Sequence, residues 1–517
     1  MYKLGIDVGG TNTDAVLIDE DLNVVAAVKN PTSDDIYTGI MGAVDAVLDE
    51  SGVDRTLIGQ AMLGTTQCTN AIVERKGLAP IAILRIGAPA TVGIPPMVDW
   101  ADDIAAVCVD ALIIEGGFEY DGKRLAEFDE AACRAFFEGV RGRVEAVAVS
   151  SVFSTVRNDD ELRAAEIARE VLGEDVHVSI SSEIGSMGLI ERENATILNA
   201  ALYDVARRFT EGFAQSLADK GVVNAEVYLS QNDGTLMTME HARRYPILTI
   251  ACGPTNSIRG ASYLSRRDDA IVIDVGGTTT DLGVLAHGFP RESGVAVTIG
   301  GVRTNFRMPD LVSVGLGGGS LVRQLEDGSV TVGPDSVGYL VTKKARCFGG
   351  DTLTATDIVV AKGLAEGVGD PTLVADLEPA LVDAAYAEIT RIIEDAVDAM
   401  KTSAGDVTVI LVGGGSILAP DQLEGSDNVL RPENFGVANA VGSAIAQVSG
   451  QIAKVFSLTE TPREQALAES KQRACDEAIE AGADPSTVEV VDVEDIPMAY
   501  LGDALCIRVK AVGDLML

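Results

Sequence analysis

The apolar and polar positions of this chain follow two alternating periods, which predict strands and helices in succession. Segment 35–52 (DIYTGIMGAVDAVLDESG) has apolar residues at helical spacing and ends near a glycine, whereas the short apolar run 81–87 (IAILRIG) is typical of a buried strand. A further helix is expected at 161–173, and a long helix from near Glu193 to Gly221. Strands that alternate with helices predict an α/β fold.

The later part of the chain continues this alternation and then changes. Segment 407–420 (VTVILVGGGSILAP) predicts a buried strand that ends in three glycines, and 437–450 (VANAVGSAIAQVSG) predicts a helix of small residues that can pack closely. The tail 455–517 contains one expected helix, at 461–482, and two expected strands. Because 517 residues are many for one core, two or three domains are expected.

One short motif occurs twice. Residues 4–19 read LGIDVGGTNTDAVLID, and residues 271–286 read IVIDVGGTTTDLGVLA. In each copy two apolar runs flank a Gly-Gly-Thr turn, which predicts a β-hairpin. Two glycines let successive backbone N–H groups turn towards an anion, so Gly9, Gly10, Gly276 and Gly277 are predicted to bind phosphate.

A carboxylate precedes each of these turns, at Asp7 and Asp274. Such a carboxylate would repel phosphate unless a divalent cation stood between them. The duplicated motif therefore predicts a nucleoside triphosphate with Mg²⁺, held between two halves built alike. Other nucleotide motifs are excluded or weak, because the chain contains no Gly-Lys-Ser/Thr sequence and no complete dinucleotide-binding unit.

The composition of the chain argues against several classes of function. The net charge of −38 argues against nucleic acid as a partner, because no basic patch is available to neutralise phosphates. The chain has three histidines and seven scattered cysteines without a Cys-x-x-Cys pair, which counts against a zinc or iron–sulfur site. The apolar strand begins directly at the N-terminus, so no targeting peptide is expected, and a cytoplasmic location is predicted.

The duplicated hairpins, together with the late strand and its three glycines, resemble the superfamily of actin, sugar kinases and heat-shock chaperones. Further motifs resemble the ATP-binding α-subunit of the hydantoinase/oxoprolinase family from residue 1 to about 450. These motifs are LGTTQCTNAIVERKG (63–77), LIERENATILNAAL (189–202), CGPTNSIRGA (252–261), VGLGGGSLV (314–322) and VGPDSVG (332–338).

This resemblance implies duplicated actin-like (ribonuclease H-like) ATPase lobes with a small C-terminal α+β appendix. The implied division is an N-terminal lobe at 1–190, a second lobe carrying the repeated hairpin at 191–452, and the appendix at 453–517. It also implies an ATP-dependent hydrolase that opens a hydantoin, 5-oxoproline or related lactam through phosphorylation of the amide oxygen. The expected cofactors are ATP and Mg²⁺.

The resemblance also assigns roles to residues. Asp7, Asp274 and Asp281 would lie near the metal and phosphates as catalytic residues, with Asp7 and Asp274 on the metal. The implied cofactor-binding set adds the remaining turn residues and two further glycine turns: Thr11, Asn12, Thr278, Thr279, Gly318, Gly319, Gly413, Gly414 and Gly415. The last three glycines would border the nucleoside. The implied substrate contacts are Thr65, Thr66, Asn70 and Arg192.

The chain departs from the family at some motif positions. Leu63 stands where the family commonly has histidine, so it either contacts an apolar part of a substrate or packs the core under the turn. Cys68, with nothing basic beside it in the sequence, fits a buried structural thiol better than a nucleophile.

Three other functions remain open for such a chain. These are a small-molecule kinase of the same superfamily, a subunit of a ketone carboxylase, and a nucleotide-controlled switch without enzymatic activity. The resemblance to the α-part alone implies a separately encoded second subunit, and an oligomer is expected. No contact with nucleic acid or membrane is expected.

Overall fold

The computed structural model describes residues 1–10, 12–31, 36–293, 296–401, 404–459, 461–498 and 503–516. Within these ranges, no helix combines the length and the apolar character that a membrane crossing requires.

The largest sheet has nine strands drawn from both ends of the chain. In spatial order they are β22 (Glu489–Pro497), β23 (Ala504–Gly513), β21 (Val448–Ser457), β10 (Leu236–Thr238), β9 (Glu226–Ser230), β4 (Ile58–Thr65), β1 (Tyr2–Val8), β2 (Asn12–Ile18) and β3 (Val24–Pro31).

A second sheet carries the repeated motif. Its order is β13 (Phe289–Pro290), β12 (Thr280–Ala286), β11 (Ala270–Val275), β19 (Val407–Val412) and β20 (Ser426–Leu430), and β16 (Leu311–Val314) also pairs with β12.

The two sheets contain the same five-strand unit. In the first, β3, β2 and β1 are successively antiparallel, and β1, β4 and β9 are parallel. In the second, β13, β12 and β11 are antiparallel, and β11, β19 and β20 are parallel. The predicted α/β fold and both predicted hairpins are therefore confirmed, and the sequence repeat corresponds to a repeat of topology.

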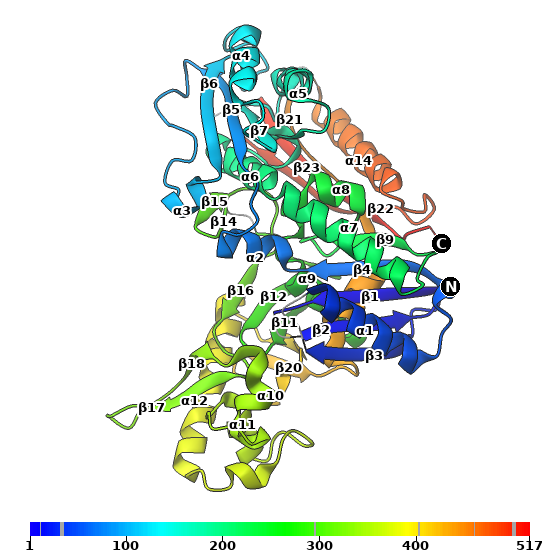
Figure 1. Cartoon of the computed structure of the whole chain (residues 1–517), viewed down its shortest axis with the longest axis vertical. Coiled ribbons are helices and arrows are strands. Elements are labelled where there is room, and N and C mark those ends of the chain that lie inside the picture. The colour runs from blue at the N-terminus through cyan, green and yellow to red at the C-terminus, as the bar shows by residue number, and fades with distance from the viewer. Residues whose placement is uncertain are drawn as a thin grey trace.

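A third, parallel sheet lies apart from the hairpins, with β5 and β7 in its centre. Its order is β6 (Cys108–Glu115), β5 (Ile81–Ala88), β7 (Ala146–Ser151) and β8 (His177–Ile180). Figure 1 shows this sheet at the top of the long axis, the hairpin β1/β2 in the middle and the yellow helices of the second lobe at the bottom. Two small ribbons complete the strands: β14 (Val297–Ile299) with β15 (Val302–Thr304), and β17 (Ser320–Gln324) with β18 (Val330–Ser336).

Helices cover the sheets and form their cores. The first sheet packs with α1 (Ile36–Ser51), α2 (Gln67–Glu74), α7 (Tyr203–Asp219), α8 (Met239–Arg244) and α14 (Arg463–Glu480). The parallel sheet packs with α4 (Glu130–Val140), α5 (Asp159–Leu172) and α6 (Leu189–Ala201), and the second sheet with α11 (Ala355–Ala361) and α12 (Pro379–Met400). The short helices are α3 (Asp102–Ala105) and α10 (Val341–Lys344).

Two helices lie between the repeated units and cross each other closely. Helix α13 (Ala438–Ile445) packs on β1 and β2, and α9 (Cys252–Ser265) packs on β11, β12 and β19. At the crossing, a Cβ on Gly442 would overlap the carbonyl of Asn256, and a Cβ on Gly260 would overlap the carbonyl of Ala438. Glycine on both helices thus allows the backbones to touch, as the small-residue pattern at 437–450 predicted.

Two details differ from the sequence-based expectation. The helix expected from Glu193 to Gly221 is divided at Leu202, and the two parts pack in different places, α6 against β7 and α7 against α1. The strands of the expected appendix also extend the nine-stranded sheet, because β21 pairs with both β10 and β23. The boundaries expected after residues 190 and 452 fall within α6 and β21, and the three-part division remains a prediction.

We expect Gly442→Ala to destabilise the chain. The added methyl group must separate α9 from α13, and such overpacking costs about 1–3 kcal/mol. Thermal and urea unfolding should report a lower midpoint.

The matched control is Gly139→Ala on α4, where an added Cβ meets no heavy atom within 4 Å. Alanine there should be neutral or stabilising by up to about 1 kcal/mol, because it favours the helix. Equal changes in the two variants would contradict the close crossing.

Candidate functional site

The two hairpin turns have the same geometry. The N–H of Gly9 donates to the carbonyl of Asn12 at 2.9 Å, and the N–H of Gly276 donates to the carbonyl of Thr279 at 2.9 Å. Gly10 is exposed in the first turn, as are Thr278 and Thr279 in the second. Thr11, expected on a phosphate oxygen, lies outside the described residues. Both turns thus leave their tips open to a ligand.

Each hairpin places two carboxylates opposite each other. Asp7 faces Asp14 across β1 and β2, and Asp274 faces Asp281 across β11 and β12. The sequence-based candidates omitted Asp14, although it follows Asp7 at the same spacing at which Asp281 follows Asp274. That spacing was the signal that could have identified it.

Asp7 is held by two amides from the crossing helices. Its carboxylate accepts a hydrogen bond from Nδ2 of Asn256 at 2.9 Å and another from Nδ2 of Asn439 at 3.0 Å. Burial raises the pKa of Asp7 to about 6; the two amides oppose this rise, whereas the charges of Asp14 and Asp274 add to it. Asp7 is therefore a positioned carboxylate that can exchange a proton near neutral pH.

Asp274 in the second hairpin has a similar environment. The Ser257 hydroxyl donates to its Oδ2, and burial raises its pKa. Burial also raises the pKa of Asp281 to about 6, with a further contribution from the Asp274 charge. A glycine packs directly against Asp7 and another against Asp274. A Cβ on Gly64 would overlap the Asp7 carboxylate, and a Cβ on Gly413 would overlap the Asp274 carboxylate.

Helix α9 joins the two halves of the site. Its consecutive residues Asn256 and Ser257 bond to Asp7 and Asp274, which belong to different hairpins. The sequence analysis included these residues only in the motif CGPTNSIRGA (252–261) and assigned them no site role. Only the helix crossing reveals that role, because the contacts join residues far apart in the chain.

The donor set fits a magnesium–nucleotide complex. Magnesium prefers oxygen ligands and is usually held by one or two carboxylates together with phosphates and water. The four hairpin carboxylates supply the oxygen atoms, and one buried oxygen, Oδ1 of Asp14, has no hydrogen-bond partner among the described residues. Among the described residues no group of three His, Cys, Asp or Glu side chains forms a metal cage alone. A cation at this site would therefore be completed by ligand oxygens.

The glycine turn at 317–319 packs directly on the second hairpin turn. The N–H groups of Gly318 and Gly319 donate to the carbonyls of Gly276 and Gly277, at 3.0 and 2.7 Å. Thr356 in turn bonds to the Gly318 carbonyl through its hydroxyl, at 2.8 Å. These two N–H groups support the phosphate turn, so direct phosphate binding by Gly318 and Gly319 would have to use other atoms.

The late glycine turn also lies at the second hairpin. Gly413 has a φ of +82°, which glycine adopts without strain, and the N–H of Gly415 donates to the carbonyl of Val275 at 2.7 Å. Gly414 between them is exposed, and a Cβ added there would meet only the side chain of Lys29. The contact of Gly413–Gly415 with a nucleoside remains a prediction.

The expected substrate residues are not all brought together. Thr65 ends β4 beside Gly64, its backbone bonded to the thiol of Cys252, and Thr66 accepts a hydrogen bond from Asn70 at 3.4 Å. Asn70 itself is exposed and lines a cavity of about 470 Å³ between α1, α2 and α7. This cavity is distinct from the carboxylate site.

Arg192 lies on helix α6, which packs against the parallel sheet. It is buried, and its guanidinium donates to the Ser181 hydroxyl and to the carbonyls of Ser186 and Ser151. Burial lowers its pKa. The guanidinium therefore supports the ends of β7 and β8, and its substrate role remains a prediction.

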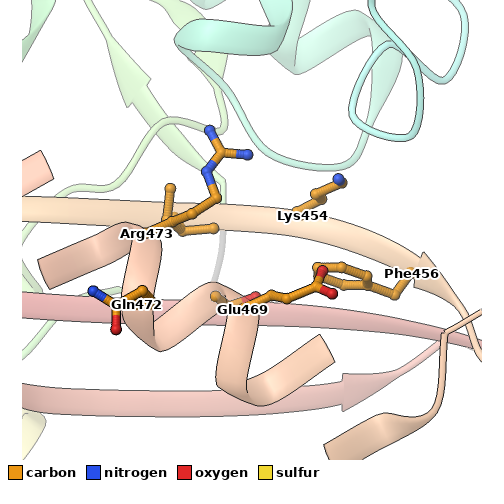
Figure 2. Close-up of a pocket in the computed structure, with 7 residues that line it drawn as sticks. Lys454, Phe456, Glu469, Gln472 and Arg473 are labelled. Atoms are coloured by element: carbon orange, nitrogen blue, oxygen red, sulfur yellow. The ribbon is translucent and has the colours of Figure 1, made fainter. Parts of the chain in front are cut away.

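A second cavity lies away from the hairpins, and two further sequence candidates are buried in the core. Figure 2 shows a cavity of about 280 Å³ between β21 and α14, lined in part by Lys454, Phe456 and Arg473, with none of the expected site residues. Leu63 is 2% exposed within the hydrophobic core, so it packs under the turn. Burial raises the pKa of Cys68 to about 12, as expected for a structural thiol.

Two family models match this chain. The model described as the hydantoinase/oxoprolinase N-terminal region matches residues 3–172, and the hydantoinase/oxoprolinase model matches residues 192–366. Together they cover about two thirds of the chain and contain both hairpins.

Similar proteins include subunits of two kinds of enzyme. Caprolactamase subunit alpha of Pseudomonas jessenii is 27% identical over 467 residues, which cover 86% of this chain and 65% of that protein. The acetophenone carboxylase gamma subunit of Aromatoleum aromaticum is 26% identical over 413 residues, which cover 70% of this chain and 53% of that protein. The chain thus spans less than two thirds of the length of these relatives.

The solved structure of ATP-dependent caprolactamase from Pseudomonas jessenii has the same fold. It superposes with a TM-score of 0.77 at 19% identity, over 100% of this chain and 88% of that chain.

We expect Asp281→Asn to change how stability depends on pH. Because burial raises the pKa of Asp281 from 3.8 to about 6, the folded chain keeps a proton that the unfolded chain has released. The free energy of unfolding of the wild type therefore falls as the pH rises from the unfolded pKa to the folded pKa, by up to roughly 3 kcal/mol. Urea unfolding of the magnesium-free chain should show the variant gaining stability relative to wild type between about pH 4 and about pH 6.5, with no further gain at higher pH.

Asp327→Asn is the control. Hydrogen bonds from Ser329 hold the pKa of Asp327 below its usual range, so the same rise in pH should give this variant no relative gain. A pH-independent difference between wild type and Asp281→Asn would show that Asp281 is not a buried carboxylate.

Proposed function

The chain belongs to the hydantoinase/oxoprolinase family, and we propose that it is the ATP-binding subunit of an enzyme that hydrolyses a cyclic amide. One observation carries this proposal: α9 joins Asp7 and Asp274, the equivalent carboxylates of two equivalent hairpins. Two anion-binding turns with carboxylates between them suit a metal-bound triphosphate. The similarity to an ATP-dependent caprolactamase supports the nucleotide and the amide.

The chain's own residues would perform defined tasks. Asp7 and Asp274 would hold Mg²⁺, and the turns at 9–12 and 276–279 would hold the phosphates. When bound, ATP would supply a phosphoryl group to the amide oxygen, which would convert a poor leaving group into phosphate. Asp7, fixed by Asn256 and Asn439, would also orient a water molecule for the attack on the activated amide.

A second subunit is part of this proposal. The relatives named above are themselves subunits. An activated amide must be kept from bulk water until it reacts, which requires a closed cavity. A partner polypeptide that covers the region between the hairpins would supply that closure.

Ketone carboxylation is the second candidate function. The similarity to an acetophenone carboxylase subunit over 70% of this chain favours it. Both reactions would use the same nucleotide site, and they differ in the acceptor and in the product. The residues that bind ATP therefore do not distinguish between them.

We expect ATP turnover coupled to ring opening when the chain is combined with its second subunit. The assay offers 5-oxoproline, hydantoin and caprolactam, and separately acetone or acetophenone with bicarbonate, and measures ADP, phosphate and the organic product. Asp274→Asn should abolish turnover because the metal loses a ligand, whereas the exposed Asp49→Asn should retain it.

The products separate the candidates. Ring-opened product would support the amidase, and a carboxylated ketone would support the second candidate. A stable phosphorylated substrate would indicate a kinase. ATP hydrolysis at a rate that does not depend on any added small molecule would indicate a switch. Ring opening by the chain alone would contradict the need for a partner.

A further inference from the structure

Lys29 lies beside the first hairpin and is paired with one of its carboxylates. It sits opposite Asp14 across β2 and β3, and its Nζ is 2.8 Å from Oδ2 of Asp14. Asp14 is 2% exposed, whereas the Lys29 side chain is 32% exposed. The ammonium therefore lies at the border between the buried carboxylates and solvent.

The carboxylates of the site have little other positive charge nearby. Within the described part of the chain, Lys29 is the only lysine, arginine or histidine that forms an ion pair with Asp7, Asp14, Asp274 or Asp281. The second oxygen of Asp14, Oδ1, is buried, and no described residue forms a hydrogen bond with it. Lys29 thus provides the one ion-paired ammonium among these four carboxylates, in a chain whose net charge is −38.

Lys29 also reaches the second lobe. A Cβ built on Gly414 would lie 3.6 Å from Cε of Lys29, although Lys29 belongs to β3 of the first sheet. Its charge also lowers the pKa of Asp274 in the second hairpin, against the effect of burial. Lys29 therefore stands where the two hairpins and the late glycine turn converge.

We propose that Lys29 is a phosphate-binding residue, which stays paired with Asp14 and donates its remaining hydrogen bonds to the terminal phosphates of bound ATP. The inference rests on the proposed nucleotide site and adds a residue that the duplicated motif does not contain. An ammonium has three N–H donors, and Asp14 occupies one of them. A phosphate within reach of the ammonium would receive the others without breaking the ion pair.

A purely structural role for Lys29 makes a different prediction. If the ammonium only neutralised Asp14, its removal would lower stability and would weaken AMP, ADP and ATP binding alike. If it binds the terminal phosphates, its removal must weaken ATP most and AMP least. The dependence on phosphate number is therefore the decisive observation.

The experiment is calorimetric titration of the whole chain with AMP, ADP and ATP in the presence of Mg²⁺. For Lys29→Met we expect a loss of tenfold or more in ATP affinity, a smaller loss for ADP and little change for AMP, because a hydrogen bond to a charged group is lost. Lys29→Arg, which keeps a charged donor, should restore most of the ATP affinity. The matched control is Lys76→Met, since Lys76 is 79% exposed and pairs with Glu74.

A second variant guards against misfolding. Lys29→Met leaves Asp14 as a buried unpaired charge, so the double variant Lys29→Met with Asp14→Asn removes both charges together. It should fold and, compared with Asp14→Asn alone, still show the selective loss of ATP affinity. Equal losses for the three nucleotides, or unchanged ATP affinity, would overturn the role of Lys29. Failure of the wild type to bind ATP would instead overturn the proposed function.

Discussion

The close crossing of α9 and α13 is the contact on which the candidate site depends. Gly442 and Gly260 let the two backbones touch, and this contact places Asn256 and Asn439 on Asp7 and Ser257 on Asp274. Each helix also packs on one of the repeated sheets. Small residues in the helix interior thus determine the relative position of two hairpins that do not pair with each other.

Electrostatics explains why this arrangement calls for a cation. Four carboxylates are enclosed around the two hairpins, and burial raises the pKa of each of them. Amides and hydroxyls oppose this rise at Asp7 and Asp274, and Lys29 opposes it at Asp14. The remaining negative charge is unfavourable in the free chain, and the proposed magnesium ion would neutralise it. We interpret the raised pKa values as the stability cost of a preformed metal site.

Much of this arrangement could be predicted from the sequence. Both hairpins and the first carboxylates, Asp7 and Asp274, follow from a duplicated local pattern. Asn256, Asn439 and Lys29 could not be predicted in this way, because their roles depend on contacts between distant segments. The position of Arg192 on α6, away from the hairpins, and the cavity beside Asn70 could not be predicted either, because a sequence motif does not show where its side chains point. Local patterns therefore predicted the elements, and tertiary packing determined which side chains meet.

In the proposed function, one Mg·ATP binds between the two hairpins and contacts both. Calorimetric titration of Mg·ATP into wild type, Asp7→Asn, Asp274→Asn and the double variant tests it most directly. We predict that each single variant loses the magnesium-dependent part of the affinity, and that the double variant loses less than the sum of the two, because both carboxylates serve the same ligand. Wild-type affinity for Mg·ATP in either single variant would contradict the account.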